Sequence, residues 1–380
     1  MGTPVYLDYN ATTPIDPEVE NEMLPYIHTF FGNPSSSYAI GRTNMEAVNR
    51  ARQQVADLIN AKPEEIVFTS GGTESNNLAI RGIALANKEK GKHIITSTIE
   101  HPAVTEVCKY LNSLGYEITY LQVDKNGKVN PNDVENAVRP DTVLITIMHA
   151  NNEVGTIQPI KEIASISRKN NILFHTDAAQ SVGKIETEVD KLWVDLLAIA
   201  GHKLYAPKGI GALYIRKGTN IENLMYGAGQ EKGLRPGTEN VPYIVALGKA
   251  CEIALRDFTK NNAQMFRMRE KLLLGLQRTL GASVKINADL KNCLPNTLSI
   301  SFEKVDAHAL TSSIGNDVFF STGSACHANS VEISPVLKAM KIDTATAAST
   351  VRISTGKNTT AEEIDLAIAA ITDTVLKLHD

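Results

Sequence analysis

Cysteine is scarce in this chain, with four residues among 380, and no two of them form a CxxC or CxxxC pair. This spacing does not favour a disulfide framework or a structural zinc site, so no metal is expected. A reducing compartment is the simplest setting for unpaired thiols. We therefore expect a cytoplasmic protein.

Long apolar runs and an excess of either charge are also missing. No run reaches the roughly 18 apolar residues of a membrane helix, and the first residues lack the basic and apolar stretches of a secretion signal. The formal net charge is −4, which gives no reason to expect binding to nucleic acid or to an anionic membrane. The sequence predicts direct contact with neither.

Short apolar segments alternate with helical patterns in the first two thirds of the chain. Strands are predicted at 65–69, 93–97, 143–148, 172–175 and 194–200, and a helix at 73–87. Repeated strand, loop and helix predict an α/β fold, with a mostly parallel sheet covered by helices on both faces. Such folds bind ligands beyond the carboxyl ends of their strands.

The pattern changes after about residue 255. Helices are predicted at 262–280 and 361–377, and strands at 297–302 and 351–354. This mixture predicts a smaller α+β domain. We expect a large domain over 16–255 and a small domain made of 1–15 and 256–380.

A glycine-rich turn precedes the predicted helix at 73–87. Gly71 and Gly72 would let backbone N–H groups approach an anion, to which the helix N-terminus adds partial positive charge. Thr73 could cap the helix and donate its hydroxyl. The alternative is an ordinary capped helix after a tight turn.

Asp177 follows the predicted strand at 172–175. A carboxylate at this edge of the sheet could keep a heteroaromatic ring nitrogen protonated, and Gln180 is expected on the same face of the next turn. The alternative is that Asp177 only caps a helix.

Lys203 follows the apolar strand at 194–200, where a solvated charge is out of place. Burial disfavours the charged form of lysine and makes the amine nucleophilic, which suits a Schiff base with an aldehyde cofactor. The alternative is a lysine whose stem is buried while its ammonium reaches solvent.

Cys326 lies among small and polar residues, which predicts a flexible, exposed loop over about 321–335. The neighbouring His327 could favour the thiolate. Cys108, Cys251 and Cys293 are instead predicted to be inert residues of the core or of helix faces.

These four motifs occur together with further segments that, on their residues, resemble the cysteine desulfurases of the class-V aminotransferase family. The further segments are LDYNATTP at 7–14, GNPSS at 32–36, EH at 100–101, NNEVG at 151–155, GLRPGT at 233–238 and VRIS at 351–354. The resemblance covers essentially the whole chain and points to the branch that supplies sulfur for iron–sulfur clusters and nitrogenase. It implies pyridoxal-phosphate fold type I, with a seven-stranded type of sheet.

The resemblance implies an enzyme that uses pyridoxal 5'-phosphate to convert L-cysteine into L-alanine. The sulfur would be held as a persulfide on Cys326 and passed to an acceptor protein such as an iron–sulfur scaffold. In this family Lys203 would bind the cofactor covalently, and Asp177 would pair with its ring nitrogen. His101 would stack on the ring and could move protons.

The same resemblance implies the remaining roles. Gly72, Thr73 and His202 are expected at the phosphate, together with Thr238 of the partner subunit, which implies a homodimer. Asn152 and Gln180 would reach the phenolic oxygen. Substrate binding is assigned to Arg352, as a bidentate fork for the carboxylate, and to Asn10, Asn33 and Asn152.

Two positions depart from the usual pattern of this branch. Ala200 stands where a phosphate-binding serine is often found, and His327 follows Cys326 where threonine is usual. A Cys–His pair is similar to what selenocysteine lyases show. A selenocysteine lyase, or an enzyme that acts on both L-cysteine and L-selenocysteine, is therefore an alternative. An aminotransferase or lyase with the same cofactor but no catalytic cysteine is a further alternative.

Overall fold

A seven-stranded mixed sheet forms the centre of the structure, which is a computed structural model. It describes residues 4–327 and 330–379; for 324–327 and 330–332 it describes the backbone alone. The strands are β2 (Ile66–Thr69), β3 (His93–Ser97), β4 (Glu117–Leu121), β5 (Thr142–Thr146), β6 (Leu173–Asp177), β7 (Leu196–Ala200) and β8 (Gly211–Ile215). Their order is β2-β8-β7-β6-β5-β3-β4. β8 runs antiparallel to β2 and β7, whereas the other neighbours are parallel. The predicted α/β fold with a mostly parallel sheet is confirmed.

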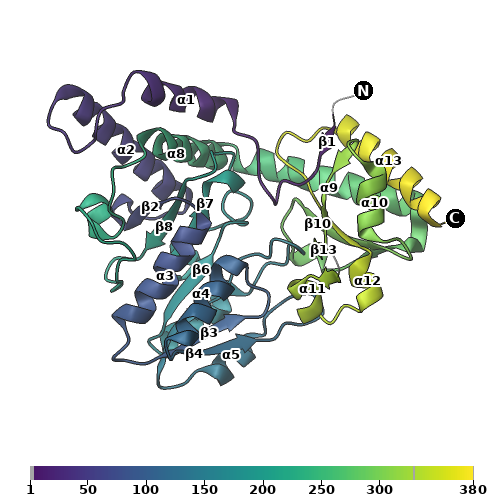
Figure 1. Ribbon diagram of the computed structural model, residues 1–380, viewed down its shortest axis with the longest axis horizontal. Helices are drawn as coiled ribbons and strands as arrows, with labels where there is room; N and C mark the ends of the chain where they lie inside the picture. Colours follow the sequence, from purple (N-terminus) through teal and green to yellow (C-terminus); the bar gives the residue numbers. More distant parts are fainter. Residues whose placement is uncertain (1–3, 328–329, 380) are drawn as a thin grey trace.

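Helices cover both faces of this sheet (Figure 1). The helices of this part are α1 (Pro17–His28), α2 (Ala39–Leu58), α3 (Gly72–Ala86), α4 (Pro102–Ser113), α5 (Pro131–Ala137), α6 (Ile160–Lys169), α7 (Val189–Leu192) and α8 (Val241–Arg256). Successive strand residues point to opposite faces. Accordingly, Ile94 and Leu144 belong to the buried cluster under α3 and α4, and Ile95 and Ile145 to the one under α2, α6 and α8.

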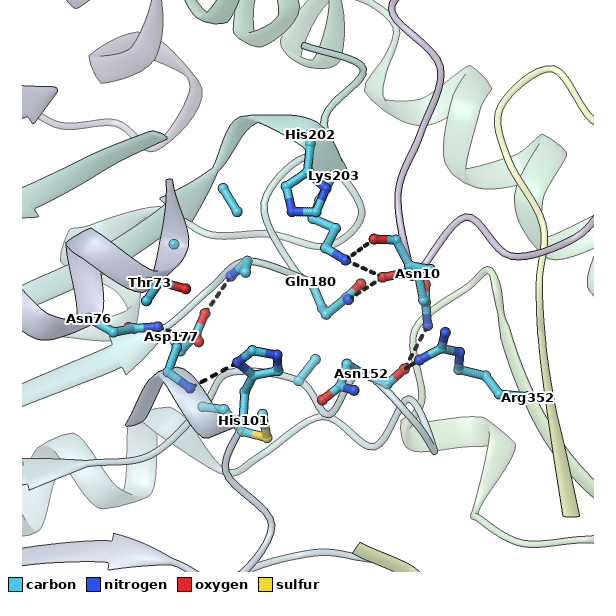
Figure 2. A pocket seen from close by; sticks show the side chains of 17 residues that line it. Asn10, Thr73, Asn76, His101, Asn152, Asp177, Gln180, His202, Lys203 and Arg352 are labelled. Atoms are coloured by element: carbon cyan, nitrogen blue, oxygen red, sulfur yellow. Dashed lines mark hydrogen bonds between the residues drawn. The ribbon is translucent and has the colours of Figure 1, made fainter. Parts of the chain in front are cut away.

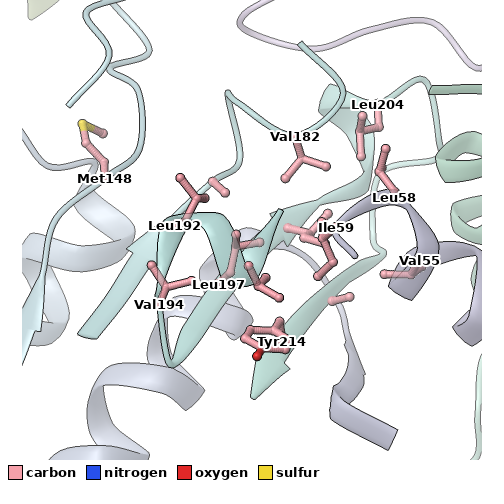
Figure 3. Close-up of a cluster of buried hydrophobic side chains, with 14 of the residues drawn as sticks. Val55, Leu58, Ile59, Met148, Val182, Leu192, Val194, Leu197, Leu204 and Tyr214 are labelled. Carbon is pink, nitrogen blue, oxygen red and sulfur yellow. The ribbon is translucent and has the colours of Figure 1, made fainter. Parts of the chain in front are cut away.

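The larger cluster joins the sheet to the end of α2. Figure 3 shows Val55, Leu58 and Ile59 facing Leu197 and Tyr214 of the sheet. Burying one such side chain fully is worth about 1.5–3 kcal/mol. The close approach of α2 and α8 needs a glycine, because a Cβ at Gly248 would lie 2.6 Å from Cα of Ala51.

A second, smaller sheet follows in the chain, with the order β12-β15-β10-β9. Its strands are β9 (Val284–Ile286), β10 (Thr297–Phe302), β12 (Ser321–Thr322) and β15 (Thr350–Ser354), and the helices of this part are α9 (Phe258–Leu280), α10 (Ala307–Ile314), α11 (Pro335–Ala339), α12 (Thr344–Ala348) and α13 (Ala361–His379). β1 (Val5–Tyr6) pairs with β11 (Val318–Phe319). Val5 and Leu7 share a buried cluster with residues of α9, β10 and α13, so the N-terminal segment packs against this later part of the chain. The domain bounds at 16 and 255 stay a prediction.

The segment predicted as a loop over about 321–335 contains paired backbone. β13 (Ser324–His327) and β14 (Ser330–Ile333) run antiparallel, with Cys326 opposite Val331. The backbone N–H of Ser334 donates to the carbonyl of Gly323 at 3.1 Å and closes the base of this hairpin. Small polar residues suggested a loop, but backbone pairing depends little on their side chains.

In the part of the chain that the structure describes, no helix has both the length and the apolar character needed to cross a membrane.

Candidate active site

A cavity of about 420 Å³ lies at the carboxyl ends of β6 and β7, where the N-terminal segment and β15 meet the large sheet (Figure 2). Most of the predicted site residues line it, namely Asn10, Gly72, Thr73, His101, Asn152, Asp177, Gln180, His202, Lys203 and Arg352. The structure therefore brings together residues that are spread over more than 340 positions of the sequence.

Asp177 is the last residue of β6, and each of its carboxylate oxygens accepts one hydrogen bond. The side-chain amide of Asn76 in α3 donates to Oδ2 at 2.7 Å, and the backbone N–H of Ala179 donates to Oδ1 at 2.9 Å. Turns rather than a helix follow Asp177, so the expectation that Gln180 lies on the next helical turn is wrong. Both side chains nevertheless face the cavity, because the tight turn keeps them close.

The first turn of α3 offers backbone donors to the cavity. The helix begins at Gly72, and no side chain caps it, so Thr73 is not the cap that was predicted but lies within the first turn. Gly71 has φ 148°, a conformation that favours glycine. Uncapped N–H groups and the helix dipole together favour an anion here.

Lys203 extends from a short 3₁₀ turn, Gly201–Lys203, directly after β7. Its ammonium donates to the backbone carbonyl of Asn10 and, at 2.6 Å, to that of Ala11. Burial, and then the nearby Arg352, lower the pKa of Lys203 to about 8, against the opposing effect of the Asp8 and Asp177 carboxylates. The ammonium thus lies within the site rather than extending into solvent.

His101 and His202 are held in their neutral forms. His101 caps α4, and its Nδ1 accepts a hydrogen bond from the N–H of Ala103 at 3.1 Å, so the proton of the neutral ring is on Nε2. Burial lowers the pKa of His101. Burial, followed by the positive charges of Lys203 and Lys208, lowers the pKa of His202 to about 4.

Arg352 in β15 reaches the cavity with part of its guanidinium already engaged. Nη2 donates to Asp8 Oδ1 and to Ser321 Oγ, both at 2.8 Å, and Nη1 donates to the carbonyl of Asn152 at 3.2 Å. The buried Nε has no hydrogen-bond partner among the described residues. Of the two hydrogens of Nη1, one makes the contact with Asn152, so the other can donate to a further anion without the loss of these contacts.

Sequence reasoning missed two residues of this region. One is Asn76, the donor to Asp177, which lies three residues after Thr73 and so on the same helix face. The other is Lys184, a buried lysine that donates to Gln180 Oε1 at 3.1 Å and to Asn10 Oδ1 at 3.4 Å. Its only signal in the sequence is a charge four residues after Gln180.

Three predicted residues are not placed at the cavity. Asn33 is exposed and accepts a hydrogen bond from the N–H of Ser35 at 2.9 Å. Thr238 is exposed and does not line the cavity of its own chain. The side chain of Cys326, like that of His327, lies outside the part that the structure describes.

The other three cysteines are buried free thiols. Burial raises the pKa of Cys108 and of Cys251 to about 12 and that of Cys293 to about 11. These thiols stay protonated at neutral pH and are poor nucleophiles.

The sheet topology defines an α/β protein. At its site, a lysine of lowered pKa and a carboxylate face one cavity beyond the strand ends. This arrangement is that of an aminotransferase-type enzyme. Residues 5–366 match the family model described as aminotransferase class-V. The chain is similar to two proteins named cysteine desulfurase IscS. The one from Methanosarcina thermophila is 47% identical over 99% of this chain and 93% of its own length, and the one from Dictyoglomus turgidum (strain DSM 6724 / Z-1310) is 46% identical over 100% and 96%.

The comparison with solved structures indicates the same family. A protein titled NifS-like protein superposes with a TM-score of 0.92 at 40% identity, covering 98% of this chain and 99% of its own. One titled SspA in complex with cysteine has a TM-score of 0.82 at 39% identity, covering 93% and 99%. The chain belongs to the aminotransferase class-V family. The predicted resemblance to the cysteine desulfurases of this family, and with it the prediction of an enzyme, is confirmed.

Proposed function

We propose that this protein is a pyridoxal 5'-phosphate-dependent cysteine desulfurase that converts L-cysteine into L-alanine and holds the sulfur on Cys326 as a persulfide. The observation that carries the proposal is the meeting of Lys203, Asp177 and Arg352 at one cavity. An amine nucleophile, a carboxylate and a guanidinium are what an aldehyde cofactor and an amino-acid substrate require.

The cavity fits the cofactor. The uncapped start of α3 at Gly72 and Thr73 offers donors for a phosphate, with His202 beside it. Asp177 would pair with the ring nitrogen, and Lys203 would hold the cofactor covalently. The bound cofactor would supply an electron sink for the substrate Cα. Ala200 lines this part of the cavity without a hydroxyl to add.

Protons would be moved by groups whose protonation the site adjusts. The amine of Lys203, once displaced by the substrate, has a pKa near the working pH and could take a proton from the substrate and return it. The Nε2–H of His101 faces the same cavity. Asn10 and Asn152 line the pocket in which Arg352 would hold the substrate carboxylate.

The overall reaction needs no external oxidant or reductant. The Cβ–S bond of cysteine breaks, an S–S bond forms between that sulfur and Sγ of Cys326, and the Cys326 proton balances the new C–H bond of alanine. An acceptor protein such as an iron–sulfur scaffold would then take the sulfur from the hairpin that bears Cys326.

We further propose a cytoplasmic homodimer in which Thr238 of the partner subunit completes the phosphate site. Thr238 is exposed and lies away from the cavity of its own chain, as a residue that serves a second subunit must. A substrate role for Asn33, which is exposed in the described chain, would likewise require the second subunit.

The test of the sulfur acceptor is Cys326→Ala, with Cys251→Ala as a matched control in the core. Cys326→Ala should form no persulfide and release no alanine from cysteine, while the absorbance of the bound cofactor stays unchanged. Cys251→Ala should keep both activities. Desulfuration at the parent rate by Cys326→Ala would show that another group accepts the sulfur.

Side-by-side turnover of L-cysteine and L-selenocysteine, with alanine quantified, tests the substrate. We expect cysteine to be turned over with Cys326-dependent persulfide formation. Turnover of selenocysteine alone would establish the selenocysteine lyase instead, and transamination without sulfur release would establish an aminotransferase.

A further inference from the structure

Lys184 is a buried lysine behind the cavity, in the turns that follow β6. The residue is only 6% exposed. Among the described residues, the hydrogen-bond partners of its Nζ are two neutral amide oxygens, Oε1 of Gln180 at 3.1 Å and Oδ1 of Asn10 at 3.4 Å. A buried ammonium without a carboxylate is unfavourable, so packing alone does not explain this residue.

The charged groups around Lys184 offer it no anion. Lys203 and Arg352 act on it as like charges and, after burial, contribute to lowering its pKa to about 7. Asp16 lines the same small cavity but pairs with Lys357. Whether charged or neutral, the amine still has hydrogens to donate.

In its ammonium form Lys184 only donates, which fixes the orientation of the amides that it contacts. Because Lys184 faces Oε1 of Gln180, the amide nitrogen of Gln180 must point the other way, and it donates to the backbone carbonyl of Asn10 at 2.9 Å. That carbonyl also accepts from the ammonium of Lys203. The NH₂ of Gln180 is thereby held beside Lys203.

Asn10 is oriented in the same way. Its Oδ1 accepts from Lys184 and, at 2.9 Å, from Asn296, so its own NH₂ donates to the carbonyl of Asn152 at 3.1 Å. Lys184 therefore shares the orientation of the Asn10 amide with Asn296 and with Thr297, whose Oγ1 accepts from the Asn10 NH₂ at 2.8 Å. At Gln180, by contrast, Lys184 is the side chain that donates to Oε1 among the described residues.

We propose that Lys184 is a positioning residue, which fixes the Gln180 amide so that a donor rather than an acceptor faces the phenolic oxygen of the bound cofactor. The proposal rests on the cofactor assigned above, and it concerns no part of the sulfur-transfer step. A fixed donor stabilises that oxygen as an anion, so a proton on the neighbouring lysine–cofactor linkage is held less tightly.

The experiment measures the pH at which the visible absorbance of the bound cofactor titrates, in the parent, Lys184→Met, Gln180→Ala and the double variant. We expect this pH to rise by about one unit in Lys184→Met, because the donor is no longer held. Gln180→Ala should produce a similar rise, and the double variant should add little to it. Lys184→Arg, which keeps a group that only donates at this position, should stay near the parent.

Lys357→Met is the matched control, because Lys357 is a partly buried lysine that pairs with Asp16. It should lose thermal stability with no change in the titration. Additive shifts in the double variant would show that Lys184 does not act through Gln180 and would overturn the proposal. An unchanged titration in Lys184→Met, with only the stability loss of Lys357→Met, would overturn it as well.

A neutron crystal structure of Lys184→Met without cofactor, in which the amide hydrogens are visible, separates this proposal from the cofactor assignment. If the parent fails to bind the cofactor, the proposed function is rejected, yet the orientation of Gln180 can still be compared. We expect the amide to turn or to occupy two orientations in the variant. A Gln180 amide that keeps its single parent orientation would overturn the role of Lys184.

Discussion

Replacing Arg352 with lysine tests the substrate-carboxylate site by a count of donors. Arginine has five N–H donors and lysine three. Arg352 already uses three of its donors in hydrogen bonds to Asp8, Ser321 and the carbonyl of Asn152. A lysine that kept these contacts would have no donor left for the substrate. Losing one or two charge-assisted hydrogen bonds costs roughly 1.5–3 kcal/mol in total, or about 10–150-fold in affinity.

The assay is steady-state alanine formation over a range of cysteine concentrations. We expect KM to rise by about that factor in Arg352→Lys, with a much smaller change in kcat, because the guanidinium binds a group that does not react. Arg216→Lys is the control, since Arg216 also donates to one carboxylate and to backbone carbonyls, yet lies outside the cavity. An unchanged KM in Arg352→Lys, or an equal rise in Arg216→Lys, would refute the assignment.

Three further predictions concern cofactor affinity and pH. Ala200→Ser adds a hydroxyl to a Cβ that lies 3.3 Å from the place that a Cβ at Gly72 would take. Titration of the apoprotein should show cofactor bound about tenfold more tightly, and an unchanged affinity would mean that other donors already suffice. Burial raises the pKa of Glu100 to about 8 from its ordinary value of 4.5. Between these two pH values the folded parent binds a proton that the unfolded chain releases, so its stability falls as pH rises. Glu100→Gln should flatten this slope in urea unfolding, and a parallel slope would contradict the prediction. Burial lowers the pKa of Lys203 to about 8. The rate of covalent cofactor attachment, measured by stopped-flow absorbance, should therefore rise about tenfold per pH unit below that value and then level off. A rate independent of pH would exclude the neutral amine as the reacting form.

The fold could be predicted from the sequence where apolar runs are long and bounded by turns. β3 and β10 have the predicted bounds. β4 was not predicted because most of its residues are only partly buried, which weakens the apolar signal. β8 was not predicted either, and its antiparallel direction could not have been, since a short apolar run has the same composition in either direction. α9 begins at Phe258, four residues before its predicted start, because a single residue, Asp257, separates it from α8.

The site was predictable where its residues follow strands. Asp177 and Lys203 end or follow adjacent parallel strands, so the rule that ligands lie beyond the carboxyl ends of strands brings them together. Lys184 was missed because its role depends on Asn10, which is 174 positions away in the sequence. The environment of Lys203 likewise needs backbone carbonyls from the N-terminal segment, which no local pattern reveals.

The charge balance of the cavity indicates which ligands it can take. Lys203, Lys184 and Arg352 bring positive charge. The carboxylates near them are Asp177, Asp8, which already pairs with Arg352, and Glu153, whose pKa is raised by burial. His101 and His202 add none, because burial lowers their pKa. A phosphate and a substrate carboxylate would supply the missing negative charge. Any aminotransferase of this family could use the same balance, so the cavity alone does not select desulfuration.

The segment at 151–155 contacts both Arg352 at the cavity and the base of the hairpin that bears Cys326. The carbonyl of Asn152 accepts from Arg352, and the next residue, Glu153, accepts a hydrogen bond from the hydroxyl of Ser334 at the base of the hairpin. Ser334 in turn caps α11. The proposed substrate-carboxylate site and the hairpin that bears Cys326 are thus anchored by adjacent residues of one turn. A substitution at Glu153 should therefore slow persulfide formation while cofactor binding at Lys203 and Asp177 persists, because only the hairpin loses its anchor.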